Sequence, residues 1–158
     1  MTLDPIQEIK DVSPQRFRLA DATAVKVGWF LQRSSTTSSF EGQWIPDATI
    51  YGTSAGTTRS IGVMPYTRTV VYSTGDDLYQ VGTTREKERE ISPITKLDYY
   101  GKNLGTSAIV VGDNVSAAIS GFQKSDTSMY IIGTAYEDIA AGKSGLVRLN
   151  LDSQTVSS

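Results

Sequence analysis

Hydrophobic and polar residues alternate most regularly near the end of the chain. Apolar residues occupy every second position from Val147 to Leu151. Because successive side chains of a β-strand point to opposite faces, this alternation predicts a strand over residues 146–151 with one buried face. Residues 130–136 are rich in β-branched and aromatic side chains, which favour strands. The polar, glycine-containing residues 137–145 lie between them, so the pattern predicts a C-terminal hairpin.

Similar β-rich runs recur along the rest of the chain. In residues 24–32, Val25, Val27 and Trp29 would share one face of a strand. Turn signals recur about every eight to twelve residues and no helical pattern alternates with the strands, which is typical of a sandwich or barrel. We therefore predict an all-β fold, a small antiparallel sandwich or barrel. Further strands are predicted over residues 40–51, 67–73, 78–81, 96–100, 107–111 and 115–119.

Polar tracts between these runs are predicted as surface loops. Arg33 is followed by serine and threonine residues up to Ser39, with no packing side chain among them. Residues 52–58 are rich in glycine, serine and threonine and form a second predicted loop. A third loop is expected over residues 121–128, before the C-terminal hairpin.

The N-terminal segment lacks a regular pattern. Pro5 and Pro14 oppose a long helix, and the apolar residues near them follow a helical face only loosely. The prediction is an extended N-terminal arm over residues 1–22, with one helical turn at residues 6–10. Two interpretations remain open: a frayed chain end, or an arm that becomes ordered against a neighbouring subunit.

One short segment alternates in charge residue by residue. It consists of Arg85, Glu86, Lys87, Glu88, Arg89 and Glu90. On a strand, the basic side chains would lie on one face and the acidic ones on the other. The segment is therefore either a solvated loop or short helix, or a protruding ribbon whose charged faces pair with another subunit.

Length and charge limit the class of protein. A chain of 158 residues with 39% hydrophobic residues is expected to form one domain, which we place at residues 23–152, with a flexible tail at residues 153–158. The net charge of −2, without a basic stripe, argues against nucleic-acid binding. No apolar run approaches the roughly 18 residues of a membrane span. No secretory signal pattern opens the chain, so synthesis in the cytoplasm is expected.

The side chains offer little chemistry. Histidine and cysteine are both absent, which removes the commonest general base, the Ser-His-Asp triad, thiol nucleophiles and most zinc sites. The adjacent pairs Asp76–Asp77 and Glu137–Asp138 would point to opposite faces of a strand rather than to one substrate. We therefore predict that the protein is not an enzyme and has no catalytic, cofactor-binding or metal-binding residues.

The aromatic residues have two interpretations. Trp29, Trp44, Tyr99 and Tyr100 could form a platform on which a sugar ring stacks. In a small β-domain, such side chains are more often anchors of the core or of an interface.

The C-terminal hairpin also carries short motifs. They read G-x-A-x-E-D-x-A-A-G over residues 133–142, G-x-V-x-L over residues 145–149, and G-D-N-V over residues 112–115. This pattern resembles the C-terminal hairpin of tailed-phage capsid decoration (cement) proteins, and the resemblance covers residues 109–151.

The resemblance implies a structural virion protein on the outer surface of a phage capsid, where it binds the major capsid protein and stabilises the shell. It also implies a homotrimer. The candidate contact residues are Leu3, Pro5, Ile6 and Ile9 of the arm, together with residues 85–90. We expect deletion of the first fifteen residues to leave a folded protein that no longer binds heads. The alternative is a phage tail or fibre accessory protein, or a carbohydrate-binding β-module.

Overall fold

The computed structural model describes residues 4–19, 25–40, 43–52, 56–67 and 90–158. These residues form thirteen strands and no helix, so the predicted all-β class is confirmed. The strands are β1 (Ile6–Val12), β2 (Phe17–Leu19), β3 (Phe30–Phe40), β4 (Gln43–Ile50), β5 (Ser60–Val63), β6 (Glu90–Ile91), β7 (Ile94–Lys102), β8 (Asn114–Ala117), β9 (Phe122–Lys124), β10 (Tyr130–Ile131), β11 (Gly133–Ala135), β12 (Ser144–Asn150) and β13 (Thr155–Val156).

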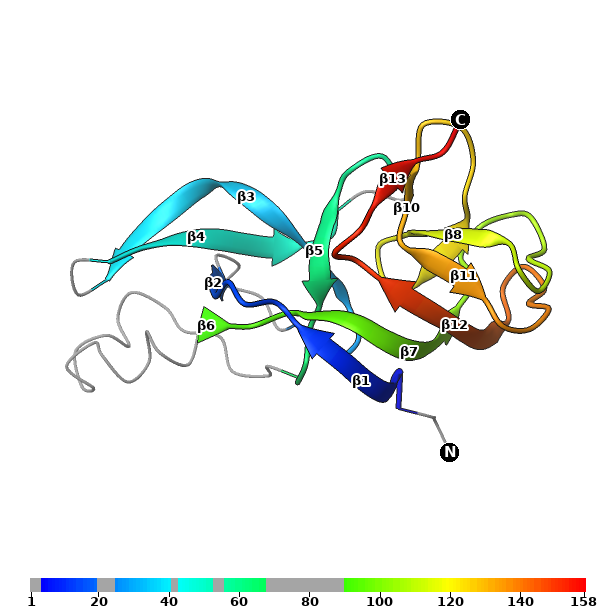
Figure 1. Ribbon diagram of the computed structural model, residues 1–158, viewed down its shortest axis with the longest axis horizontal. Coiled ribbons are helices and arrows are strands. Elements are labelled where there is room, and N and C mark those ends of the chain that lie inside the picture. Colours follow the sequence, from blue (N-terminus) through cyan, green and yellow to red (C-terminus); the bar gives the residue numbers. More distant parts are fainter. Residues whose placement is uncertain (1–3, 20–24, 41–42, 53–55, 68–89) are drawn as a thin grey trace.

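Eleven strands form one sheet in the order β6-β2-β4-β3-β5-β7-β12-β11-β8-β9, with β1 paired to β7. Neighbouring strands are antiparallel, except that β2 and β4 are parallel. β1 and β12 both pair with residues 96–99 of β7, so they lie on opposite sides of that strand. β10 and β13 form a separate two-stranded sheet. The tip of the β3–β4 hairpin projects beyond the other described strands (Figure 1).

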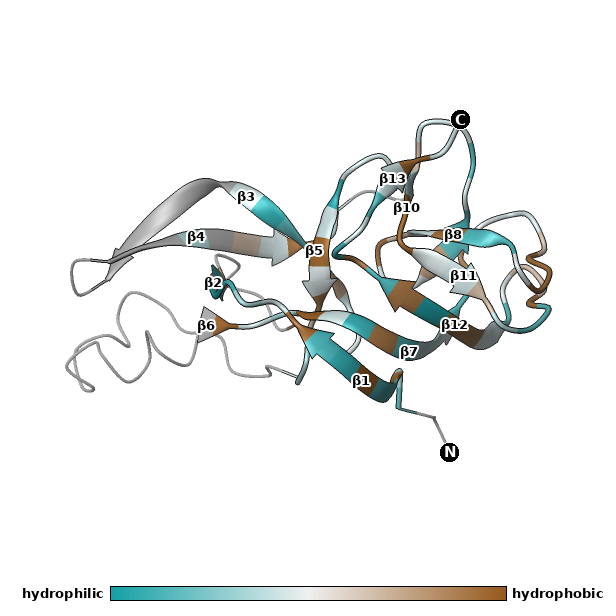
Figure 2. Ribbon diagram, viewed as in Figure 1, coloured by the Kyte–Doolittle hydropathy of each residue, from teal (hydrophilic) through white to brown (hydrophobic). Residues whose placement is uncertain are grey.

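Buried apolar side chains form two clusters. The larger core includes Phe30, Tyr51, Leu97, Tyr99, Ile109, Val115, Phe122, Ile132, Ile139, Val147 and Leu149. The smaller core consists of Phe17, Leu19, Val25, Leu31, Ala48, Met64 and Ile91. Burial of this apolar area is the main contribution that stabilises the folded state. Along β7 and β12, hydrophobic and hydrophilic positions alternate (Figure 2).

The C-terminal hairpin is confirmed. β11 pairs with β12 from Gly133 opposite Leu149 to Ala135 opposite Val147. Val147, Leu149 and Leu151 are buried, as their spacing predicted. Gly133 lies so close to the backbone of Arg148 that a Cβ atom would collide with it, which explains why this position is glycine.

The predicted loop at residues 33–39 is wrong. This tract belongs to β3, which pairs with β4 as far as Phe40 opposite Gln43. Backbone hydrogen bonds define a strand, so a hairpin that extends from the body does not need an apolar face along this tract. The second predicted loop, 52–58, contains no strand in its described part, residues 52 and 56–58.

Other boundaries also moved. Only the end of the first predicted strand, from Phe30 onward, is in β3, and Val25 makes an isolated bridge. Residues 107–111 contain no strand, because Ile109 pairs only through an isolated bridge to Ile139. β9 lies within the predicted loop 121–128. The hairpin predicted over residues 67–81 falls outside the described residues, apart from Thr67.

The N-terminal segment belongs to the main sheet. The predicted helical turn at residues 6–10 is wrong, because these residues are part of β1. β1 pairs with β7 from Ile6 opposite Tyr99 to Val12 opposite Ile94, and register shifts interrupt the ladder. Prolines flank this strand rather than interrupt it, so they do not oppose pairing. At the other end of the chain, Thr155–Val156 form β13 and pair with β10.

Candidate functional site

The structure places the predicted contact residues in different environments. Leu3 and residues 85–89 lie outside the described part of the chain. Glu90 begins β6, where its backbone lies opposite Arg18 of β2. Glu90 is the one residue of the predicted charged segment 85–90 that the structure describes, so the prediction that this segment pairs with another subunit stays a prediction.

Two arm residues contact their own chain. Ile6 is half-buried and packs against the larger core. The backbone N–H of Tyr100 donates a hydrogen bond of 2.8 Å to the carbonyl of Pro5. The Pro5 ring lies against Gly28, whose φ of +86° and missing Cβ allow this close approach. Pro5 and Ile6 thus attach the arm to the domain.

Ile9 and Val12 are the two exposed apolar residues of β1. Their side chains are 53% and 45% exposed. Ile9 was predicted as a contact residue and Val12 was not. The two residues are three positions apart, which a simple alternation would place on opposite faces, and register shifts between them break that alternation. Deletion of residues 1–15 would remove β1 from the sheet, so that deletion would not separate loss of folding from loss of binding.

The loops at one end of the domain, residues 107–113 and 136–143, form a paired structure that we call the end loops. The N–H of Ile109 donates to the carbonyl of Ile139 at 2.9 Å, and the N–H of Ile139 donates to the carbonyl of Ile109 at 2.8 Å. Each loop turns at a glycine in the left-handed region, Gly112 with φ +90° and Gly142 with φ +79°. The two motifs of the resemblance therefore fold against each other.

Carboxylates fix the conformation of the end loops. Asp113 accepts a hydrogen bond from the N–H of Val110 at 3.0 Å, and Asp138 accepts one from the N–H of Val111 at 2.9 Å. Glu137 accepts a hydrogen bond from the N–H of Leu146 at 2.8 Å. The bond from Val110, together with Lys124 at 3.0 Å, lowers the pKa of the Asp113 carboxyl below its ordinary value. Glu137 and Asp138 thus bind different backbone segments.

The end loops expose apolar side chains on this fixed backbone. Val110 is 51% exposed and Val111 is 62% exposed. Tyr136 is also exposed, and the guanidinium of Arg148 lies over its ring at 4.5 Å from the centroid. Arg148 also forms an ion pair of 2.9 Å with Asp98. The sequence predicted a strand over residues 107–111 and a hairpin connection over residues 137–145, and it did not select Val110 or Val111 as contact residues.

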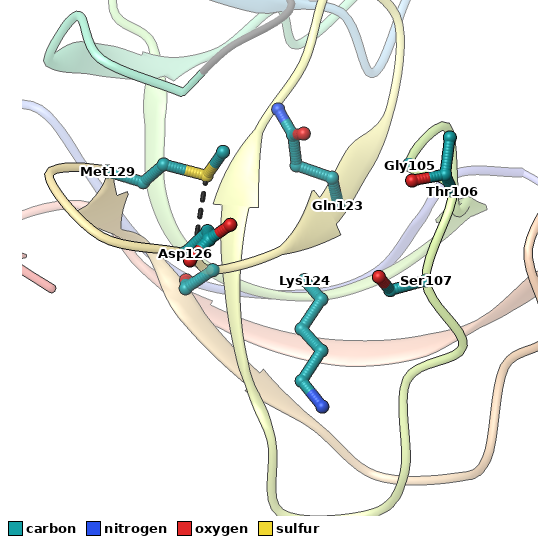
Figure 3. A pocket seen from close by; sticks show the side chains of 8 residues that line it. Gly105, Thr106, Ser107, Gln123, Lys124, Asp126 and Met129 are labelled. Carbon is teal, nitrogen blue, oxygen red and sulfur yellow. Dashed lines mark hydrogen bonds between the residues drawn. The ribbon is translucent and has the colours of Figure 1, made fainter.

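A polar pocket of about 340 Å³ lies beside the end loops. Its walls come from residues 105–107, residues 123–126 and Met129. In Figure 3, Met129 and Asp126 lie on one side and Thr106 and Ser107 on the other, with Gln123 and Lys124 between them. Sequence reasoning missed this pocket, because residues 121–128 were interpreted as a plain loop.

Three of the four candidate aromatic residues come together. Trp29, Tyr99 and Tyr100 line a second pocket of about 230 Å³, which Pro5 borders. Tyr99 is buried and donates a hydrogen bond of 2.7 Å to the carbonyl of Gly28. Burial raises the pKa of its phenol well above the ordinary value. Trp44 lies in β4, opposite Ser39.

Among the residues that the structure describes, no group of three or more acidic side chains is placed to hold a metal ion. The same part of the chain contains no helix that is long and apolar enough to cross a membrane.

Comparison with known proteins reveals a distant structural likeness. No protein-family model matches the chain. No curated protein matches it either. Among solved structures, the fold is similar to that of the head fibre gp8.5 N base of bacteriophage phi29, with a TM-score of 0.47 and 14% sequence identity. The match covers 86% of this chain and 92% of that chain, and we take no function from it.

Proposed function

We propose that the protein is a structural virion protein that binds the major capsid protein and stabilises the outer surface of a phage head, as a homotrimer. One observation carries this proposal. The segment that resembles decoration proteins folds as a hairpin with paired end loops. Its motif residues make the close contacts, turns and hydrogen bonds that form this hairpin.

The motif positions are explained one by one. Gly133 and Gly145 leave room for the Arg148 backbone and the Ile139 side chain, respectively. Gly142 provides the left-handed turn. Glu137 and Asp138 bind backbone N–H groups of neighbouring segments. The resemblance therefore involves residues that together build one local structure, and the proposal rests on that hairpin.

The end loops offer a suitable contact surface. The backbone N–H groups of Val110 and Val111 donate hydrogen bonds to the carboxylates of Asp113 and Asp138, and these bonds hold both valines in place before any partner binds. A surface that is ordered in advance loses little conformational entropy on binding, so its apolar area contributes more to affinity. We include Ile9 and Val12 of β1 as a second proposed contact.

Co-sedimentation with expanded heads of the phage whose genome encodes the chain tests the proposal. We expect the double variant Val110→Asp/Val111→Asp to lose head binding while its far-UV spectrum and melting temperature stay unchanged. The variant Ile9→Asp/Val12→Asp tests the second contact in the same way. Val156→Asp is the matched control, because Val156 in β13 is 53% exposed and should tolerate a charge without effect on binding.

Two outcomes would contradict the proposal. If the unmodified protein stays in the supernatant at saturating concentrations, capsid decoration is wrong. If light scattering after size-exclusion chromatography gives the mass of a monomer at micromolar concentration, the homotrimer is wrong. Full binding by the end-loop variant would instead move the contact away from Val110 and Val111.

A further inference from the structure

Hydrogen bonds from side chains next to the polar pocket fix the conformation of its walls. Asn103 is fully buried, and its side chain donates to the carbonyl of Ser107 at 2.9 Å and to that of Ile139 at 3.2 Å, and accepts from the N–H of Gly105 at 3.1 Å. A buried amide with all these bonds fixes the loop that forms one wall. On the opposite side, a 2.7 Å bond between the hydroxyls of Ser116 and Ser125 holds the strand end.

Met129 supplies an apolar wall. Its sulfur accepts a hydrogen bond of 3.3 Å from the N–H of Asp126, which Figure 3 shows as a dashed line. Gly56, with φ +68°, lies behind it, and a Cβ atom there would come within 3.3 Å of the Met129 side chain. The thioether is therefore confined at the edge of an otherwise polar pocket.

Charge selects against ionic ligands. The Lys124 ammonium forms an ion pair of 3.0 Å with Asp113, so its positive charge is already compensated. One oxygen of Asp126 accepts a hydrogen bond of 2.7 Å from the N–H of Thr127, and its carboxylate lines the pocket. Among the described residues that line the pocket, Lys124 is the one cation, so an anion would meet this carboxylate without an uncompensated positive charge to offset it. A metal ion would find fewer than three acidic ligands among the described residues.

We infer that this pocket binds a neutral saccharide residue, independently of any contact with a capsid. A sugar ring presents hydroxyl groups at its edge and C–H groups on its faces. The hydroxyls match Thr106, Ser107 and the Asp126 carboxylate, and the C–H face matches Met129. The volume of about 340 Å³ suits a small ligand.

Titration of the ¹⁵N-labelled full chain tests this inference. The probes are glucose, galactose, N-acetylglucosamine and rhamnose, each raised to about 50 mM, well above a millimolar Kd. We expect at least one of them to give saturable amide shifts in residues 105–107, 123–126 and 129. The variant Ser107→Phe fills the pocket and should abolish these shifts.

Asp126→Asn keeps the local hydrogen bond from Thr127 but removes the carboxylate, and should weaken binding about tenfold. Its matched control is Asp11→Asn, because Asp11 is exposed and accepts a hydrogen bond of 2.9 Å from the next residue, Val12, in the same way. Ser153→Phe is the control for Ser107→Phe, because Ser153 is an exposed serine outside the pocket. Both controls should bind as the unmodified protein does.

Three results would overturn the inference. One is the absence of saturable shifts with all four sugars. The second is shifts confined to Trp29, Tyr99 and Tyr100, which would place sugar binding in the aromatic pocket. The third is equal binding by Asp126→Asn and by the unmodified protein. The same spectra report folding of each variant, so Asp126→Asn decides the question if Ser107→Phe does not fold.

Discussion

At the scale of single residues, space and hydrogen bonds determine the C-terminal motif. A Cβ atom on Gly133 would meet the carbonyl group of Arg148 in the adjacent strand, and one on Gly145 would meet the side chain of Ile139. The carboxylates of Glu137 and Asp138 accept hydrogen bonds from the backbone N–H groups of Leu146 and Val111, respectively. These residues are therefore required by the local fold, whatever partner the end loops bind.

We predict that Gly133→Ala lowers the free energy of unfolding by about 1–3 kcal/mol, because β11 and β12 must separate to admit the methyl group. Urea denaturation measures the effect. Gly52→Ala is the control: the nearest atom to its added Cβ would be a carbonyl oxygen at 3.9 Å, and we expect a change within about 0.5 kcal/mol. A Gly133→Ala protein as stable as the control would show that the two strands are not held this closely.

The burial of Val147 and Leu149 could be predicted, because strand periodicity alone assigns them to one face. The role of Gly133 could not, because it depends on which backbone lies beside it in the folded sheet. The same limit applies to the pocket around Asp126. Its walls come from segments that no local pattern brings together, and the buried Asn103 that supports them is one polar residue among many in the sequence.

At the scale of elements, β1 and β3 show how long-range pairing overrides local pattern. Residues 6–10 have weak helical spacing, but β7 offers an edge that they can pair with. Residues 33–39 are polar throughout, but β4 supplies backbone partners. Tertiary context regularly outweighs propensity in strands, so both predictions failed for the same reason.

We predict opposite outcomes for the two isoleucines of β1. Ile6→Ala should lower the free energy of unfolding by about 1–2 kcal/mol, because Ile6 packs against the larger core. Ile9→Ala should change it by no more than about 0.5 kcal/mol, because its side chain is 53% exposed. Thermal or urea unfolding of the two variants measures these changes. An equal decrease in the free energy of unfolding for both variants would mean that β1 does not pack on the larger core through Ile6.

At the scale of the whole molecule, Tyr99 and Gly28 connect the two cores. Tyr99 belongs to the larger core and donates its hydroxyl to the carbonyl of Gly28. The N–H of Gly28 in turn donates to the carbonyl of Met64, a residue of the smaller core, at 2.9 Å. The ring of Tyr99 also contacts that of Phe30, with centroids 5.4 Å apart. The two clusters are thus coupled through one short stretch of backbone.

Tyr99→Phe should therefore lower the free energy of unfolding by about 1–2 kcal/mol at neutral pH, because it leaves the Gly28 carbonyl without this donor. The folded state raises the pKa of the Tyr99 phenol above its ordinary value of 10.0, so the hydroxyl contributes fully below pH 10 and loses its contribution as the pH rises further. The difference in the free energy of unfolding between the unmodified protein and Tyr99→Phe should therefore become smaller above pH 10. Denaturation curves at pH 7 and above pH 10 measure this difference in the free energy of unfolding. A difference that grows above pH 10 would contradict the role given to the Tyr99 hydroxyl.

The ladder between β1 and β7 joins residues 6–12 to residues 94–99. During synthesis, the ribosome releases the first strand several seconds before its partner, at about 5–20 residues per second. Throughout that interval the nascent β1 carries Ile9 and Val12 with no neighbouring β7 beside them. β1 therefore waits for most of the chain to be synthesised before it can join the sheet.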